Sequence, residues 1–143
     1  MKKSSKFIKG FKIFLIIVFV VKIAKLLLFL TKFKKKSDIF LFFNGKKQVF
    51  KDKKLKNTTI SILFGGMELD LREAIIGDDP VVLDITGRFS GFSIKVNPEW
   101  NVKLEGTFSK SGISNESKYD EDNKEAPQLT IKYDLKFSGL EIK

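Results

Sequence analysis

The sequence predicts an all-β C-terminal domain, a β-solenoid or β-roll, preceded by one N-terminal hydrophobic membrane helix. Apolar and polar residues alternate with period two from about residue 60 onward, which is typical of half-buried strands. A short motif that contains Phe and Gly returns along the same stretch, and a lysine-flanked apolar run lies near the N-terminus. These patterns divide the chain into an anchor helix (1–36), a basic connector (37–57) and a β domain (58–143).

The charge of the chain is distributed unevenly. Residues 1–56 contain 17 Lys against two Asp, a net charge of +15, whereas residues 57–143 contain ten Lys and Arg against 15 Asp and Glu, a net charge of −5. A protein that was basic throughout would suggest a nucleic-acid partner. A basic segment joined to a mildly acidic domain is better suited to an anionic membrane surface. We therefore expect anionic lipid, and no nucleic acid, as a partner.

Residues 13–30 form an apolar run that is interrupted by Lys22 and Lys25. About 20 apolar residues are enough for a helix to cross the hydrocarbon core of a bilayer. The chain would then be a cell-membrane protein, single-pass or peripheral, and the lysines on both flanks give opposing indications of its orientation. The residues expected to meet the membrane are Phe11, Phe14, Leu15, Ile16, Phe19, Lys22, Lys25, Leu28 and Phe29.

Two other interpretations of this run remain open. Lys22, Lys25, Lys32 and Lys36 fall on one side of a helix, which is the pattern of an amphipathic helix lying in the membrane interface. A cleaved signal peptide is the third interpretation. The absence of a small-residue cleavage pattern after the run argues against it.

The connector at 37–57 is rich in lysine and contains Asn44-Gly45, a dipeptide typical of tight turns. It is interpreted as a hairpin that caps the β domain, as a segment at the membrane surface, or as a solvated linker. Lysines close to an anionic surface each contribute about 1 kcal/mol of attraction. The lysines expected to bind lipid headgroups are Lys34, Lys35, Lys36, Lys46, Lys47, Lys51, Lys53 and Lys54.

The repeated motif begins at Phe64, Phe89, Phe108 and Phe137, so it returns at intervals of roughly 20–30 residues. Glycine follows each Phe within a few residues, and we expect it to let the chain turn a corner without a Cβ clash. Each motif lies between two strands in the same order, which favours a solenoid over the alternative, a β-sandwich. The final strand would lie at an open end, and the acidic stretch 114–128 would be a flexible surface loop.

The β domain contains, in this order, Phe64, Gly65, Gly66, Phe89, Gly91, Pro98, Trp100, Phe137 and Gly139. In the order and spacing of these residues, 58–143 resembles the C-terminal domain of LiaF-type proteins, the cell-wall-active antibiotic response family of Gram-positive bacteria. The four-helix membrane region typical of that family is absent, and Ser90-Gly91 and Ser138-Gly139 replace two of its Gly-Gly pairs. The resemblance implies a regulatory role in cell-envelope stress, with a sensor kinase or another envelope protein as partner.

The sequence contains no Cys and no His, which removes Cys and His nucleophiles, His general bases and Cys/His metal sites. The acidic pair Asp78-Asp79 and the acidic stretch 119–123 are better explained by a turn and a solvated loop than by a calcium site. We expect no catalytic residue, no cofactor and no bound metal. The predicted function is a non-enzymatic binding or regulatory protein of the bacterial envelope. The alternatives are a self-assembling solenoid scaffold and an anionic-lipid sensor.

Overall fold

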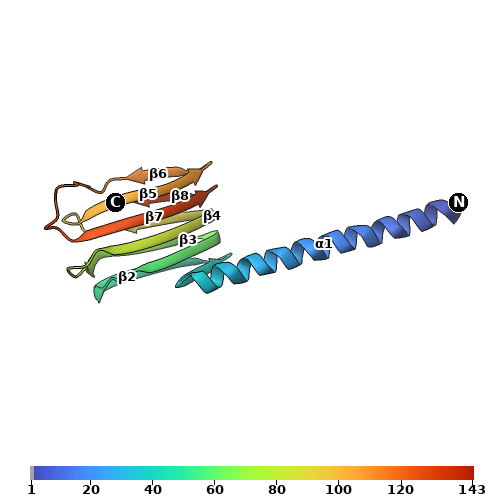
Figure 1. Ribbon diagram of the computed structural model, residues 1–143, viewed down its shortest axis with the longest axis horizontal. Coiled ribbons are helices and arrows are strands. Elements are labelled where there is room, and N and C mark those ends of the chain that lie inside the picture. Colours follow the sequence, from blue (N-terminus) through green and yellow to red (C-terminus); the bar gives the residue numbers. More distant parts are fainter. Residues whose placement is uncertain (1) are drawn as a thin grey trace. The chain divides into compact units, whose positions relative to one another are not determined.

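The computed structural model describes residues 2–143, except the side chains of residues 2–8, Phe33 and Lys35. The chain divides into two compact units, Met1–Lys36 and Ser37–Lys143, each of which is described by itself. The proposed headgroup contact of Lys35 therefore lies outside the described side chains. The elements are α1 (Lys2–Lys36), β1 (Ile39–Phe42), β2 (Gly45–Lys54), β3 (Thr58–Ile75), β4 (Val81–Lys95), β5 (Asn101–Ser109), β6 (Gly112–Asn115), β7 (Gln128–Lys136) and β8 (Gly139–Ile142) (Figure 1).

The helix α1 contains one segment, Lys9–Lys32, that is long and apolar enough to cross a membrane. At about 1.5 Å per residue, its 24 residues span roughly 36 Å, against about 30 Å for the hydrocarbon core. Residues 13–21 are uninterrupted apolar residues, so apolar side chains surround the helix instead of forming one stripe. The exposed side chains of α1 include all the predicted membrane residues: Phe11, Phe14, Leu15, Ile16, Phe19, Lys22, Lys25, Leu28 and Phe29.

The second unit is the predicted β-solenoid. Five coils, 39–54, 58–75, 81–95, 101–115 and 128–142, lie side by side, and every strand pairing among the described residues is parallel. Each coil runs toward one end of the domain, turns a corner and returns (Figure 1). The β-sandwich alternative is wrong, because the hairpins of a sandwich would pair antiparallel strands.

The spatial order of the coils differs from their order in the sequence. β7 lies between β4 and β5, and β8 lies between β4 and β6, so the last coil is inserted ahead of the fourth. The final strand is therefore internal and is paired on both sides, which corrects the expectation that it lies at an open end. The residues that point inward from the last coil, Leu129, Ile131, Leu135, Leu140 and Ile142, are all buried.

The basic connector folds as the first coil of the solenoid, so the β domain begins at Ser37 and not at residue 58. β1 and β2 both pair in parallel with β3 and not with each other, so the hairpin interpretation of Asn44-Gly45 is wrong. Phe43-Asn44-Gly45 instead forms a corner in register with the corner that follows Leu63. The short apolar run in β1 makes this possible, because Ile39 and Leu41 pack against the same core as the later coils.

The core consists of columns of apolar side chains that repeat from coil to coil. Residues at equivalent positions of paired parallel strands face the same side, so one column contains Leu69, Ile94 and Ile142. Each of these three side chains is at most 2% exposed. Such columns hold the coils at the inter-strand spacing, and this spacing also sets the distance between equivalent side chains at the corners.

Candidate functional site

The corner of every coil is formed by one residue in the left-handed backbone region. These residues are Phe43, Phe64, Phe89, Lys110 and Phe137, and their φ angles are 50°, 55°, 52°, 49° and 50°. A left-handed conformation costs a non-glycine residue roughly 1–2 kcal/mol. This conformation occurs in all five coils, and four of the five residues are phenylalanine. The side chain at this position therefore makes contacts that glycine could not make.

The role expected for the glycines is wrong in most coils. The positive φ belongs to the residue two positions earlier, and a Cβ built at Gly91, Gly112 or Gly139 would meet nothing within 4 Å. Gly65 is different, because its Cβ would overlap the carbonyl oxygen of Asn44. Glycine is therefore required by space at the second position of one corner only, 64–66.

The third copy of the motif begins at Lys110 and not at Phe108. The pairing of β5 with β7 places Phe108 opposite Leu135 and Ser109 opposite Lys136, so Lys110 takes the corner position. The tripeptide Lys-Ser-Gly at 110–112 matches Phe-Ser-Gly at 89–91 and 137–139. Alignment on Ser-Gly instead of on Phe would have found this corner from the sequence.

Four of the corner residues form a stacked aromatic ladder. Adjacent ring centroids lie 4.8 Å apart for Phe43 and Phe64, 5.0 Å for Phe64 and Phe89, and 4.9 Å for Phe89 and Phe137, with interplanar angles of 1–3°. These separations are close to the inter-strand spacing of about 4.8 Å, so the parallel coils force the rings face to face. The four rings are nevertheless between 44% and 68% exposed. We call this row the Phe ladder.

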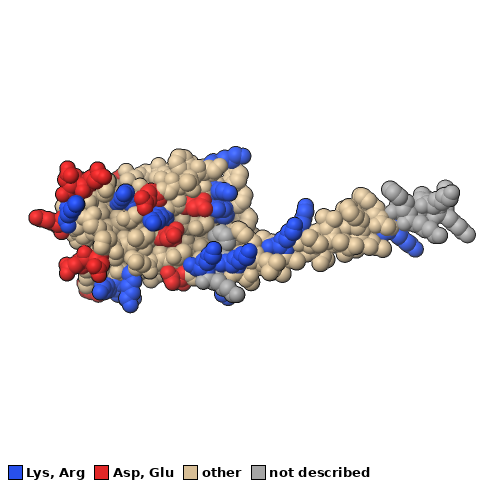
Figure 2. All heavy atoms as spheres, in the orientation of Figure 1, with Lys and Arg blue, Asp and Glu red and all other residues tan. Residues whose placement is uncertain are grey.

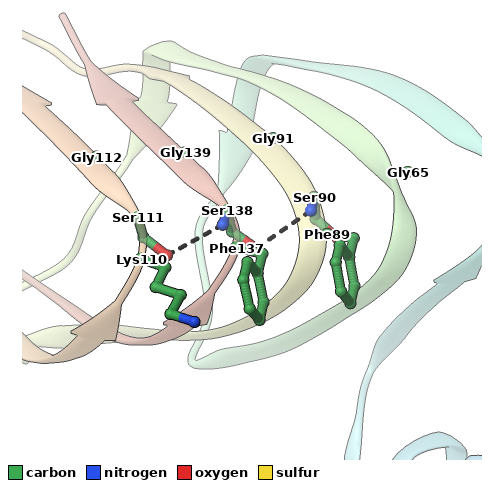
Figure 3. A pocket seen from close by; sticks show the side chains of 10 residues that line it. All are labelled: Gly65, Phe89, Ser90, Gly91, Lys110, Ser111, Gly112, Phe137, Ser138 and Gly139. Atoms are coloured by element: carbon green, nitrogen blue, oxygen red, sulfur yellow. Dashed lines mark hydrogen bonds between the residues drawn. The ribbon is translucent and has the colours of Figure 1, made fainter.

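Lysine ends the Phe ladder at the outer coil. The Lys110 ammonium lies 5.1 Å from the centroid of the Phe137 ring, within the range of a cation–π contact. Figure 3 shows the two rings of Phe89 and Phe137 side by side, with Lys110 next to Phe137 in the adjacent coil. The ladder therefore combines an apolar ridge with a fixed positive charge at one end.

Serines complete the backbone hydrogen bonds behind the ladder. The Ser90 amide donates to Ser138 Oγ at 3.1 Å, and the Ser138 amide donates to Ser111 Oγ at 3.0 Å (Figure 3). Each hydroxyl also donates to the carbonyl two residues earlier, at 2.8 Å. Buried amides need a partner, and the left-handed residue interrupts the strand pairing at this point. The serines thus hold the corners in a fixed geometry.

The lysines predicted to bind headgroups are spread along one edge strand. Lys46, Lys47, Lys51, Lys53 and Lys54 all lie on β2, which leads away from the corner. From Lys46 to Lys54 a strand covers roughly 26 Å at about 3.3 Å per residue. These side chains and those of Lys34 and Lys36 are exposed. The five lysines of β2 do not gather at either end of the domain.

The opposite end of the domain contains a half-enclosed pocket of about 320 Å³. Pro98 lines it, together with Trp100, whose side chain is only 5% exposed and belongs to the core. Two of the cations around its rim are paired with neighbours, Arg72 with Asp70 and Lys143 with Glu141. The pocket thus offers an apolar floor and a charged rim that also contains Lys95, Lys118 and Glu116.

The Asp70–Arg72 pair has a clear electrostatic signature. Arg72 Nε and Nη2 donate to the two carboxylate oxygens of Asp70 at 2.9 and 2.7 Å. The side-chain hydrogen bonds from Arg72 lower the pKa of Asp70 from its ordinary 3.8 to about 2. The carboxylate is therefore ionised at all ordinary pH values, and the pair acts as a fixed element of the pocket rim.

The acidic loop spans 116–127 and not the predicted 114–128, because residues 114 and 115 belong to β6 and Gln128 begins β7. The loop is attached to the domain through Asn101. The Asn101 side chain donates to the carbonyl oxygens of Asp120 and Asn123 and accepts from the Asp120 amide, at distances of 2.7 to 3.1 Å. Among the described residues, no group of three or more acidic side chains is placed to hold a metal ion. The loop thus adds negative charge at the end of the domain that lies opposite the Phe ladder.

The chain was compared with known proteins. A scan against protein-family models and searches of curated proteins and of solved structures found no match to this chain. Function is therefore inferred from the apolar helix, from the Phe ladder and from the charges on the domain.

Proposed function

We propose that this chain is a membrane-anchored, non-enzymatic binding or regulatory protein of the bacterial cell envelope. The observation that carries the proposal is the apolar segment Lys9–Lys32, which is followed within a few residues by a solenoid that begins at Ile39. A rigid β domain held at a membrane is suited to contacts with a membrane protein such as a sensor kinase. The resemblance to LiaF-type proteins motivates a role in envelope stress.

The described part of the β domain favours binding over catalysis. Its half-enclosed pocket with an apolar floor is rimmed by ion pairs such as Asp70–Arg72, in which the carboxylate is held in its ionised form. A general acid or base needs a pKa near the working pH. The exposed Phe ladder, by contrast, is a surface for contacts and not for chemistry.

Cell fractionation of a chain that lacks residues 1–36 tests the anchor. We expect the full chain in the membrane fraction after a high-salt wash and the truncated chain in the soluble fraction. A matched control keeps the helix but changes Leu15→Lys and Ile16→Lys, since a central lysine costs roughly 2.5–3.5 kcal/mol on insertion scales. A truncated chain that stays in the membrane fraction would contradict the anchor.

Complementation tests the regulatory role. Loss of the gene is expected to change the transcriptional response of the source cells to a wall-active antibiotic. The full chain, but not the chain without residues 1–36, is expected to restore the response. An unchanged response in cells without the gene would contradict a role in envelope stress while leaving the anchor intact.

The alternative of a self-assembling scaffold receives less support from the edges of the solenoid. β2 forms one edge, and it carries five exposed lysines, positive φ at Asp52 and two irregularities in its pairing with β3. Lysines and bulges on an edge strand oppose the addition of another strand. At the opposite edge, the Val102 amide of β5 donates to the Lys118 carbonyl of the acidic loop at 2.9 Å, so part of that edge is occupied.

A further inference from the structure

The Phe ladder is an apolar ridge whose neighbours in sequence include no acidic residue. Within two residues of the five corner residues, the sequence contains three cations, Arg88, Lys110 and Lys136, and no Asp or Glu. Lys110 and Lys136 are exposed, whereas Arg88 is paired with Asp134 at 3.2 Å. The corner end of the domain thus combines half-exposed aromatic rings with two available positive charges.

The opposite end of the domain has the opposite charge. The four loops there, 55–57, 76–80, 96–100 and 116–127, contain eight Asp and Glu against three Lys. Figure 2 shows acidic side chains gathered at the end of the domain where these loops lie. An anionic surface would therefore attract the corner end and repel the loop end, which orients the domain.

The tether to α1 is long enough for the corner to reach the membrane that holds the helix. Ser37 and Asp38 are already held by β3, because the Asp38 amide donates to a β3 carbonyl at 2.8 Å and the hydroxyl oxygens of Ser37 and Ser61 lie 2.6 Å apart. Ser37 therefore lies close to Ser61, which is three residues and about 10 Å from the corner at about 3.3 Å per residue. The four residues of the helix beyond Lys32 rise about 6 Å, and the single step from Lys36 to Ser37 adds about 3.8 Å. Together these two lengths match the distance to the corner.

A lipid surface explains features of the ladder that stacking alone leaves open. Stacking covers the faces of the rings, yet each of the four phenylalanines remains about half exposed. Aromatic side chains favour the headgroup level of a bilayer, where one part of the ring is apolar and the other is wet. A row of rings at one height, ending in lysine, matches a flat anionic surface better than a concave partner.

We propose that the Phe ladder, together with Lys110 and Lys136, is a second membrane contact that lies at the headgroup level of an anionic bilayer. This inference rests on the proposed membrane attachment through α1. The two contacts together would hold the β domain upright, with its pocket and acidic loop directed away from the bilayer. The occupant is the lipid itself and not a protein.

Tryptophan fluorescence in vesicles tests the inference with the full chain. Phe89→Trp places a reporter in the middle of the ladder and keeps an aromatic ring there for stacking. The chain is reconstituted into vesicles of phosphatidylglycerol and phosphatidylcholine in equal parts, with brominated acyl chains as quencher. We expect the Phe89→Trp reporter to lose emission whichever way the chain has inserted, because both leaflets contain the same lipids.

Two matched controls make the result specific. Tyr119→Trp puts the reporter in the acidic loop at a position of similar exposure, 47% against 53% for Phe89, and its emission should not be quenched. Trp100, the single natural tryptophan, is buried at the same distant end and should also be unaffected. Vesicle flotation of each sample shows that the chain is inserted, and thermal unfolding shows that the variant is folded.

Charge variants identify the surface that faces the lipid. Lys110→Gln with Lys136→Gln should restore part of the lost emission, as should vesicles of phosphatidylcholine alone. Lys51→Gln with Lys53→Gln on β2 should leave the quenching unchanged. The reverse result would assign the contact to the β2 edge and overturn the inference.

Three further outcomes would also overturn it. A folded Phe89→Trp chain that floats with the vesicles but is not quenched shows that the ladder stays in water, while the anchor stands. Shielding of the same reporter from iodide in detergent that grows with protein concentration shows that a second copy covers the ladder. A chain that does not float with the vesicles contradicts the anchor and the ladder contact together.

Discussion

Replacing Gly65 with alanine is a direct test of the corner geometry. A Cβ at this position would overlap the carbonyl oxygen of Asn44 and would lie 3.2 Å from Cγ2 of Ile62, which is a buried core residue. The Asn44 carbonyl also accepts a hydrogen bond from the Gly66 amide at 3.2 Å. The first coil must therefore move away from β3 to accommodate the new methyl group, and this movement disturbs the hydrogen bond.

The expected cost follows from these two effects. Insertion of a methyl group into a packed site costs about 1–3 kcal/mol. Weakening of one backbone hydrogen bond adds about 0.5–1.5 kcal/mol. The sum, about 1.5–4.5 kcal/mol, corresponds to a drop of roughly 6–18 °C in the melting temperature at about 4 °C per kcal/mol.

Gly91→Ala is the matched control, since it lies in register with Gly66 of the same corner row and its Cβ would meet nothing within 4 Å. Alanine there should leave the melting temperature unchanged or raise it slightly, because it restricts the unfolded chain by about 0.4–1 kcal/mol. Both variants are measured by thermal unfolding of the full chain in detergent micelles, followed by the β-sheet circular dichroism signal. Equal melting temperatures for the two variants would refute the proposed geometry of the first corner.

Three further measurements address the ladder, the ion pair and the loop. Phe89→Ala removes two stacking contacts of about 0.5–1.5 kcal/mol each, so it should lower the unfolding free energy by about 1–3 kcal/mol. Phe108→Ala, outside the ladder, should change the unfolding free energy by less than about 0.5 kcal/mol. Equal effects of the two substitutions would contradict the ladder. Because the pKa of Asp70 is lowered to about 2, its pairing with Arg72 stabilises the fold above pH 3.8 and loses this effect as the pH falls through 2. The difference in unfolding free energy between the natural chain and Arg72→Gln should therefore disappear over that pH interval. A constant difference would contradict the pairing. Asn101→Ala should speed proteolysis within 116–127, because it removes the hydrogen bonds that hold the loop; an unchanged cleavage rate would show that the loop is held elsewhere.

The Phe ladder joins stability and the proposed membrane contact at the same residues. The parallel coils place the rings in stacking contact, and the columns of core side chains hold the coils in register. A substitution that removes a ring therefore weakens both the fold and the ridge. Phe89→Trp keeps the ring and is thus the more informative variant for membrane contact, while Phe89→Ala is the more informative variant for stability.

The positions of the charged side chains on the β domain are determined by the fold. The sequence places most lysines ahead of Asn57, which suggested a lipid-binding cluster in the connector. The structure distributes five of those lysines along the edge strand β2, while Lys110 and Lys136, which are far apart in the sequence, come to the same corner row. Proximity in the chain was a poor guide here because successive coils of a solenoid return to the same corner.

The sequence by itself determined the class of the protein. The period-two alternation required strands with one buried face, the Phe and Gly motif required a repeated corner, and the apolar run at 13–30 required a helix that could meet a membrane. These signals are local, and each depends only on neighbours within a few positions. The strand content and the apolar helix could therefore be predicted without knowledge of the fold.

Only the tertiary structure decided the order of the coils and the identity of the corner residues. Nothing local distinguishes the coil 128–142 from its neighbours, so its insertion between β4 and β5 depends on residues that are distant in the chain and paired in space, as Val81 and Leu129 are. The register of β5 with β7 likewise put Lys110, and not Phe108, at the corner. Parallel pairing joins residues far apart in the chain, and the free energy that selects one register arises from core packing that no single segment contains.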